Sequence, residues 1–506
     1  MKILLLYPEY PVTFWSFKHA LSFIAKKASF PPLGLMTIAA MLPGDWEVRL
    51  LDMNTHRLRD RDILWADYVF VSAMIVQVES VREVLARCRE LGRSVVAGGP
   101  LFTTGHGEFA GMVDHMVLDE AEETLPRFLR DLEAGTPARI YRASVRADIT
   151  ASPVPRRSLI STRNYGAMNI QYSRGCPFDC EFCNITSLFG RVPRTKTSEQ
   201  MLAELDSIHA LGWRGCVFIV DDNFIGNKVK LKREILPAIT AWMERNRHPF
   251  TFTTEVSINL ADDAELMELM VRAGFDTVFV GIESPNEESL QECSKQANKG
   301  RDMVQSILKM QRAGLEVQGG FIVGFDSDPS SIFDQMIAFI QESSVVTAMV
   351  GLLNALPDTK LYDRLMREGR LLETTTGNNT DFTINFRPFM EPERLLEGYR
   401  RIMRTIYAPG HYYARIRQFI RNYRPNQRKL FHVRLNYLMA IPRSIVRLGI
   451  LGRERFHYWH LFFWTLLRRP RMFHVAITLS IYGYHFRRMV RDLERQFRPG
   501  HEAPAK

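Results

Sequence analysis

The sequence predicts an α/β protein: a doubly wound, Rossmann-like unit, then a partial (β/α)6 barrel of the TIM type, then a mostly helical region. Two observations predict the α/β part: short apolar runs alternate with helical patterns in two stretches, and a proline-rich segment separates them. The third observation is a change in composition after residue 400, where acidic residues become rare. We therefore expect units at residues 1–141, 167–375 and 376–506, with a linker at 142–166.

The first unit is expected to be a parallel sheet that binds a ligand at one edge. Its predicted strands, residues 3–6, 48–51, 68–72, 94–97 and 115–118, are short and apolar, and helical patterns lie between them. Ligands of such folds lie beyond the carboxyl ends of the strands, where this sequence has Pro8, Asp52, Ser72, Met74, Gly98 and Gly99. The glycine pair indicates either a tight turn or a close approach of the backbone to a ligand. Because the unit lacks both GxGxxG and a P-loop, an ordinary dinucleotide is disfavoured.

The second unit repeats a strand and a helix six times. Its linker, residues 142–166, is rich in proline and small polar residues and has no periodicity. Strands are predicted at residues 169–173, 216–221, 251–255, 277–282, 317–323 and 348–353, and the helices between them end at glycines such as Gly274 and Gly314. In (β/α) barrels the chemistry lies at the carboxyl ends of the strands. Asp221, Glu255 and Glu283 stand at those ends.

Three of the six cysteines, Cys176, Cys180 and Cys183, lie within eight residues after the first barrel strand. Their CxxxCxxC spacing is typical of a metal centre rather than of a disulfide framework. Three thiolates can hold a four-iron cluster with one iron left open, whereas structural zinc normally takes four ligands, and no Cys or His completes a local set. We therefore favour an iron–sulfur cluster over zinc and over three unrelated cysteines.

The segment around these cysteines resembles the radical S-adenosylmethionine (SAM) superfamily, because the motif CxxxCxΦC is complete, with Phe182 as its aromatic residue. The resemblance covers the chain to about residue 370. It implies that Cys176, Cys180 and Cys183 are the catalytic residues and bind a [4Fe–4S] cluster, at which SAM is cleaved to a radical. It also implies that SAM lies against Phe182, Asp221, Glu255, Glu283, Gly319, Gly320 and Ile322. For the carboxylates, salt bridges at the barrel mouth are the alternative.

The order of a doubly wound unit, a proline-rich linker and a CxxxCxxC barrel resembles the cobalamin-binding radical SAM proteins. The segment 31–35 and the residues at the strand ends support this resemblance. The motif DxHxxG, which supplies a histidine to cobalt in other cobalamin proteins, is absent, because no glycine follows Asp52 and His56 in the right place. The resemblance therefore implies cobalamin bound without a histidine, with Met74 as the candidate residue beneath the cobalt. The implied contacts are Pro8, Gly34, Asp52, Ser72, Met74, Gly98 and Gly99.

The helical region carries a strong positive charge. Residues 401–506 contain 22 Lys and Arg but only four acids, whereas acids outnumber bases in the first 400 residues. Aromatic and aliphatic residues are interleaved with the arginines, and the apolar stretches at 456–467 and 472–486 are too short to span a bilayer. This pattern favours contact with a membrane surface or a lipid. A helical domain packed on the barrel and an RNA-binding surface are the alternatives.

The whole arrangement is similar to the hopanoid methylase family, on the segments 220–227 and 279–283. The resemblance implies methyl transfer to an unactivated carbon of a lipid-like substrate, with electrons from a flavodoxin- or ferredoxin-type donor. One alternative is a cobalamin-dependent radical cyclase or oxidoreductase acting on a tetrapyrrole or another hydrophobic product. An alternative of another class is a membrane- or RNA-binding scaffold with a vestigial cluster. We expect a cytoplasmic protein, peripheral at the inner face of the membrane, and nucleic acid is disfavoured as a partner.

Overall fold

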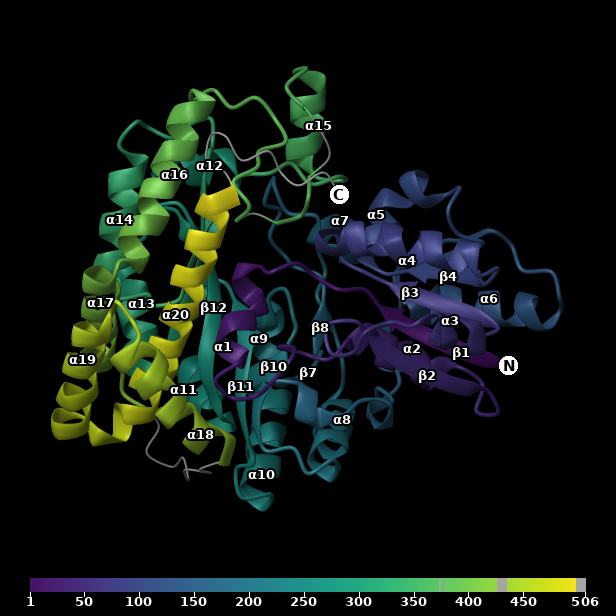
Figure 1. The fold of residues 1–506 in the computed structure, drawn as a ribbon, viewed down its shortest axis with the longest axis horizontal. Coiled ribbons are helices and arrows are strands. Elements are labelled where there is room, and N and C mark those ends of the chain that lie inside the picture. Colours follow the sequence, from purple (N-terminus) through teal and green to yellow (C-terminus); the bar gives the residue numbers. More distant parts are fainter. Residues whose placement is uncertain (373–374, 379, 426–434, 497–506) are drawn as a thin grey trace.

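The computed structural model describes residues 1–372, 375–378, 380–425 and 435–496. Two parallel sheets lie side by side, and the C-terminal helices pack on the second of them (Figure 1). The predicted α/β fold class is confirmed. Residues 373–374 of the predicted second unit, and 379, 426–434 and 497–506 of the predicted third unit, lie outside the described residues.

The first sheet has the strand order β2-β1-β3-β4-β5-β6, and all its neighbours are parallel. Helices cover both of its faces, so successive residues of β1 enter two different cores: Leu4 and Leu6 on one face, Ile3 and Leu5 on the other. Its strands are β1 (Lys2–Tyr7), β2 (Glu47–Asp52), β3 (Tyr68–Ser72), β4 (Ser94–Gly98), β5 (His115–Val117) and β6 (Ile140–Tyr141). Its helices are α2 (Leu33–Met41), α3 (Asp60–Trp65), α4 (Val78–Glu90), α5 (Pro100–Phe109) and α6 (Ala121–Glu133).

The second sheet is an open parallel sheet with the order β14-β13-β12-β11-β10-β7. The strand predicted at residues 169–173 is shorter than expected. The chain turns away after β7 because Asp221 accepts hydrogen bonds from the Tyr172 N–H (2.8 Å) and the Ser173 hydroxyl (2.5 Å). The following residues form β8 (Ser173–Arg174), antiparallel to β9 (Arg194–Thr195). The sheet strands are β7 (Met168–Ile170), β10 (Gly215–Ile219), β11 (Phe250–Val256), β12 (Phe275–Glu283), β13 (Glu316–Val323) and β14 (Ala348–Leu352).

The helices of this second unit begin and end where the sequence indicates. Thr197 and Gln200 form a reciprocal cap at the start of α8, and α11 and α13 end at Gly274 and Gly314, whose φ values are +108° and +104°. The helices are α7 (Ile185–Phe189), α8 (Ser198–Ala210), α9 (Lys228–Lys230), α10 (Leu236–Arg245), α11 (Ala264–Ala273), α12 (Glu287–Glu292), α13 (Met303–Ala313), α14 (Ile332–Glu342) and α15 (Lys360–Arg367).

The C-terminal helices share one core with the barrel. Tyr407, Tyr412, Phe419 and Phe486 are buried in it, so the packing alternative holds for the helices that carry them. Within the described residues, no helix combines the length and the apolar character needed to cross a membrane. The helices are α16 (Pro392–Tyr407), α17 (Pro409–Asn422), α18 (Leu435–Ser444), α19 (Arg455–Arg468) and α20 (Phe473–Gln496), with a π-helical segment (Ile445–Ile450) before α19.

The connection between β1 and α2 leaves its own sheet and enters the second unit. It contains the short helix α1 (Lys18–Leu21), which packs on α20 and lies near β12 in Figure 1. The ring of Phe14 stacks on that of Phe486 with centroids 4.2 Å apart, and Phe23 is buried in the barrel core. The first 30 residues therefore join the first sheet, the barrel and the last helix.

Candidate active site

The cysteine triplet lies on the loop between β8 and α7, at the carboxyl ends of the barrel strands. Burial raises the pKa of all three thiols, that of Cys183 to about 12, and neighbouring thiols of the triplet raise the pKa of Cys180 and Cys183 further. Iron binds the thiolate form, so a bound cluster has to supply the positive charge that stabilises it. Among the described residues, no three Cys, His, Asp or Glu side chains are arranged to hold a single metal ion.

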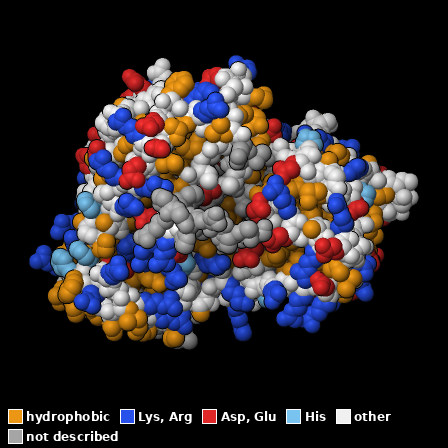
Figure 2. Space-filling view, turned by 45° about the horizontal axis from the view of Figure 1, so that its top comes forward, with side chains coloured by type: hydrophobic (Ala, Val, Ile, Leu, Met, Phe, Trp, Pro, Cys, Tyr) orange, Lys and Arg blue, Asp and Glu red, His pale blue; other side chains and the backbone are white. Residues whose placement is uncertain are grey.

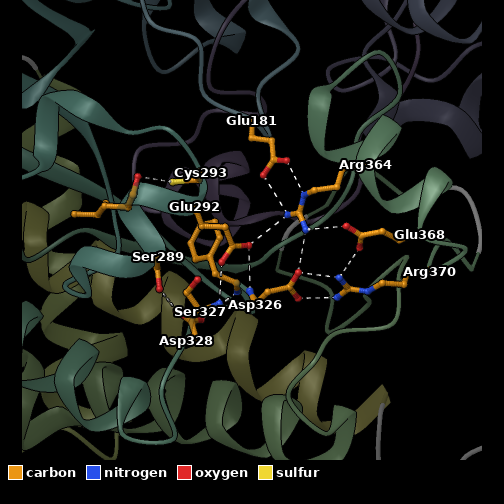
Figure 3. A network of polar contacts seen from close by, with 12 residues as sticks. Glu181, Ser289, Glu292, Cys293, Asp326, Ser327, Asp328, Arg364, Glu368 and Arg370 are labelled. Atoms are coloured by element: carbon orange, nitrogen blue, oxygen red, sulfur yellow. Dashed lines mark hydrogen bonds and ion pairs between the residues drawn. The ribbon is translucent and has the colours of Figure 1, made fainter.

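A network of ion pairs fixes this loop (Figure 3). The guanidinium of Arg364 on α15 donates to both carboxylate oxygens of Glu181, at 2.7 and 3.1 Å, and Glu181 stands between Cys180 and Cys183. Arg364 also contacts Asp326 at 3.0 Å, and Arg370 holds the same carboxylate at 2.6 Å. The loop is thereby attached to α15 and to the segment that follows β13, so the spacing of the thiols does not depend on the loop alone.

Carboxylates and one lysine stand beside the thiols. Burial, followed by the charges of neighbouring carboxylates, raises the pKa of Asp222 to about 7 and that of Glu255 to about 8. Glu283 instead pairs with Lys295, with the Nζ–Oε1 distance at 2.7 Å. Burial alone would lower the pKa of Lys295, but Glu283 and the nearby Cys180 raise it, so the lysine stays charged. Sequence reasoning missed Lys295, because an isolated lysine between two short helices carries no pattern.

The residues predicted to contact SAM do not all lie together. Phe182 and Ile322 meet in one apolar cluster beside the cysteine loop. A Cβ on Gly320 would lie 2.6 Å from the ring of Phe279, on the side of the sheet that faces away from the helices, whereas one on Gly319 would meet Ile282 at 3.0 Å in the core under the helices. The carboxylate of Asp221, as described above, holds the turn after β7.

The residues predicted to contact cobalamin lie along the carboxyl edge of the first sheet, except Gly34, which is in α2. Asp52 is buried and accepts a hydrogen bond from the hydroxyl of Tyr165 at 2.9 Å, so it also attaches the linker. A Cβ on Gly99, whose φ is +87°, would lie 2.5 Å from the Ser72 hydroxyl, so this edge accepts only glycine there. Met74 is exposed, and the carbonyl of Pro8 accepts from the amide of Gln77 at 2.5 Å.

Buried ion pairs join the first sheet to the cysteine loop. Arg174, two residues before Cys176, pairs with Glu120 at 3.0 Å and with Glu122 at 2.8 Å, at the start of α6. Arg194 on β9 pairs with Glu120 at 2.9 Å. The edge with Ser72 and Gly99 is thereby held at a fixed position relative to the thiols. No sequence pattern indicates this interface, since its acids and bases lie more than 50 positions apart.

Comparison with known proteins places these units in a family. Family models match at residues 25–129 (B12 binding domain), 170–340 (Radical SAM superfamily) and 359–498 (a domain of unknown function, DUF4070). An uncharacterized methyltransferase of Synechocystis sp. is 41% identical over 98% of this chain and 93% of its own length. The hopanoid C-2 methylase of Rhodopseudomonas palustris is 32% identical over 92% of this chain and 90% of its own length. The chain belongs to the cobalamin-binding radical SAM enzymes.

Solved structures agree with this family at the level of the fold. The cobalamin-dependent SAM radical enzyme OxsB, with aqua-cobalamin bound, superposes with a TM-score of 0.63 over 98% of this chain and 81% of its own, at 14% identity. As a cobalamin-binding radical SAM enzyme, the protein uses a [4Fe–4S] cluster, SAM and cobalamin, and it takes a small-molecule substrate and an external reductant. The prediction of an enzyme rather than a scaffold is confirmed.

The carboxylates beside the thiols give this cobalamin-binding radical SAM enzyme a testable pH dependence. The folded apoprotein holds Glu255 protonated up to about pH 8, whereas the unfolded chain releases that proton near the ordinary value of 4.5. The unfolded state thus binds fewer protons between these values, and stability falls as the pH rises through this window. We expect the melting temperature of the apoprotein to fall from pH 5 to pH 8, and to fall less in Glu255→Gln. Equal slopes, measured by differential scanning fluorimetry, would contradict a neutral Glu255.

Proposed function

We propose that this enzyme transfers a methyl group to an unactivated carbon of a lipid-like substrate of the hopanoid or isoprenoid type. The observation that carries the proposal is the 32% identity to the hopanoid C-2 methylase, which extends over nine tenths of both chains. Methyltransferase names among the relatives support the reaction type. The electron donor in this proposal is a flavodoxin or ferredoxin.

In this proposal the site residues divide into three groups. Cys176, Cys180 and Cys183 hold three irons of the cluster and leave one open to SAM. Phe182 and Ile322 provide the apolar cluster against the adenine, and Glu255 and Lys295 face the polar end of SAM. The edge formed by Ser72, Met74, Gly98 and Gly99 receives cobalamin. The bound cofactors supply the radical and the methyl group, while the protein's own side chains orient the substrate carbon and exclude water.

The decisive experiment is product mass. The protein, reconstituted without oxygen with iron, sulfide and cobalamin, is given SAM, a reductant and a hopanoid such as diploptene. A product heavier by one CH2 unit supports the proposal, whereas loss of hydrogen or gain of oxygen favours the cyclase or oxidoreductase alternative. An unchanged lipid, together with methylation of another compound in a cell extract, would contradict the lipid substrate.

A surface of the C-terminal helices supports peripheral contact with an anionic membrane. One face of α19 is buried through Tyr458, Leu461 and Thr465, but its opposite face exposes Phe456, Phe463 and Leu467. Ile450, which ends the adjacent π-helical segment, and Leu451, which follows it, are also exposed. Exposed arginines flank them, and orange and blue side chains adjoin at the lower left of Figure 2. We call this surface the tail patch; its exposed arginines are Arg453, Arg455, Arg468, Arg469 and Arg471.

Substitutions in the tail patch test this contact. Deleting residues 411–506 would remove α17 and α20 and expose the barrel core, so the test uses surface changes. We expect the double change Phe456→Ser and Leu467→Ser to weaken binding to vesicles containing phosphatidylglycerol by roughly tenfold or more, because two large apolar side chains no longer insert. Co-sedimentation measures this, with Val145→Ser, exposed in the linker, as the control. Undiminished binding would contradict the patch as the contact surface.

A further inference from the structure

The inner face of the second sheet, which faces away from the helices, is not filled by its own side chains. On β10 the outward residues Val217 and Ile219 are buried under the helices, whereas the inward Phe218 between them is half-exposed. The same alternation runs along β11 and through the middle of β12. In a closed barrel the inward side chains interdigitate and fill the interior. Here they keep their access to solvent.

Three of the accessible side chains on this face are aromatic or apolar, and they stand among polar ones such as Thr253 and Glu255. Phe218 on β10, Phe279 on β12 and Met349 on β14 all point inward and are half-exposed. Phe279 stands directly opposite Glu255 in the pairing of β11 with β12, so this apolar region begins beside the polar mouth. Gly320 allows this arrangement, since the ring of Phe279 occupies the place of a side chain there.

The connection between β1 and α2 adds two more aromatic rings to the same face. Trp15 meets Phe279 edge-on with centroids 5.3 Å apart, and its indole N–H donates to the sulfur of Met349 at 2.9 Å. Phe30 lies 5.1 Å from Phe218, centroid to centroid. Both added rings are half-exposed. The barrel and a segment from the first unit therefore build an open surface jointly, with aromatic and apolar side chains on both sides of Thr253 and Glu255.

We infer that Trp15, Phe30, Phe218, Phe279 and Met349, here called the apolar wall, bind the rigid hydrocarbon body of the substrate, and that Trp15 and Phe30 determine its specificity. The inference rests on the proposed function and adds to it the residues that select the substrate. Aromatic rings held in place by the fold contact a fused-ring or isoprenoid surface at little entropic cost, and water leaves both surfaces. With the hydrocarbon on the wall, the carbon to be modified lies toward Glu255 and the thiols.

A second feature supplies a reporter. Cys216 is half-exposed on the inner face of β10, two residues from Phe218, and its sulfur lies 3.7 Å from the hydroxyl of Thr253. Cys88 and Cys293 are buried. In the reconstituted holoenzyme the cluster occupies the triplet, so alkylation by iodoacetamide, located by peptide mass spectrometry, reports on the space in front of the wall.

The test measures two quantities in the holoenzyme, with diploptene in detergent micelles as the probe. They are the rate of Cys216 alkylation and the yield of methylated product per 5′-deoxyadenosine. We expect diploptene to slow alkylation of Cys216 about tenfold in the unaltered protein and to protect far less in Trp15→Ala or Phe30→Ala. In these variants the cluster spectrum stays unchanged, KM for diploptene rises by about tenfold or more, and the yield of methylated product per 5′-deoxyadenosine falls. Trp65→Ala, a half-exposed tryptophan on α3, is the matched control.

Three outcomes decide the question. The apolar wall is supported if diploptene slows alkylation of Cys216 in the unaltered protein and if the variants yield less methylated product per 5′-deoxyadenosine. The apolar wall is contradicted if diploptene does not change the rate of Cys216 alkylation in a protein that methylates diploptene, and if Trp15→Ala leaves the KM for diploptene unaltered. If magnesium protoporphyrin IX monomethyl ester slows alkylation of Cys216 but diploptene does not, the wall is supported as a substrate surface, but the substrate is not a hydrocarbon. In that case the proposed lipid function is contradicted and the apolar wall is not.

Discussion

Replacement of Cys176 by alanine is expected to abolish both the cluster and reductive SAM cleavage. Three thiols lie on the loop after β8, and burial already makes each thiolate costly in the absence of metal. With only two thiols left, the cluster loses one of its iron ligands. We therefore expect loss of the cluster's visible absorption and electron paramagnetic resonance signal, and 5′-deoxyadenosine formation at background level.

The matched control for this variant is Cys216→Ser. Cys216 lies on the inner face of β10 in the second sheet, outside the cysteine triplet. We expect its substitution to leave iron content and SAM cleavage unchanged. Cleavage that persists in Cys176→Ala, or that disappears equally in Cys216→Ser, would contradict the assignment of the cluster to the triplet.

Replacement of Arg174 by alanine is expected to cost about 3 kcal/mol of folding free energy, because it leaves buried carboxylates without their partner. The side chains of Glu120 and Glu122 are only 2% and 5% exposed. Arg194 still pairs with Glu120, but no other cation among the described residues contacts Glu122. Chemical denaturation of the apoprotein measures the loss. Since Arg174 precedes the cysteine loop, cluster retention should fall as well.

The pH dependence separates this role from a general loss of packing. Burial alone would raise the pKa of Glu122, but the hydrogen bond and charge of Arg174 hold it below its ordinary value of 4.5. The pair's contribution is therefore complete above pH 4.5 and is lost as the pH falls through the lowered pKa. The stability difference between Arg174→Ala and the unaltered protein should shrink in acid. Arg191→Ala, at an exposed pair with Asp179, should cost less than about 1 kcal/mol at any pH. Equal losses in the two variants would contradict the interface role.

The strands and the thiols were predictable because their causes are local. Each barrel strand is an apolar run bounded by a polar residue or a glycine, and helix ends such as Gly274 follow from backbone conformation alone. The cysteine spacing likewise depends on three residues of one loop. Lys295 could not be predicted, because its partner Glu283 is brought to it by the bulge at the end of β12 rather than by sequence spacing.

In the C-terminal region, composition alone did not distinguish buried side chains from exposed ones. Its arginines and aromatic residues predicted a surface for lipid, but Tyr407, Tyr412 and Phe419 are buried against the barrel. Helical periodicity predicts an apolar face on a helix but not the element on which that face packs. Here α16 packs on α14, and α17 packs on α13. By contrast, α19 and the π-helical segment before it keep apolar side chains exposed beside arginines. The inner face of the sheet was missed for the same reason, since Trp15 and Phe30 belong to a different unit from the strands they contact.

The contact between the start and the end of the chain has a consequence for biosynthesis. The ring of His485 hydrogen-bonds the carbonyl of Phe14 across 471 positions of sequence. During synthesis, Phe14, Phe23 and the adjoining barrel surface have no cover until α20 leaves the ribosome, so nearly the whole chain must be held soluble before its core can close. A chaperone that shields these side chains would determine the yield of active protein. For the same reason, nascent chains that stop before α20 leave Phe14 and Phe23 uncovered and should aggregate more readily than the full chain.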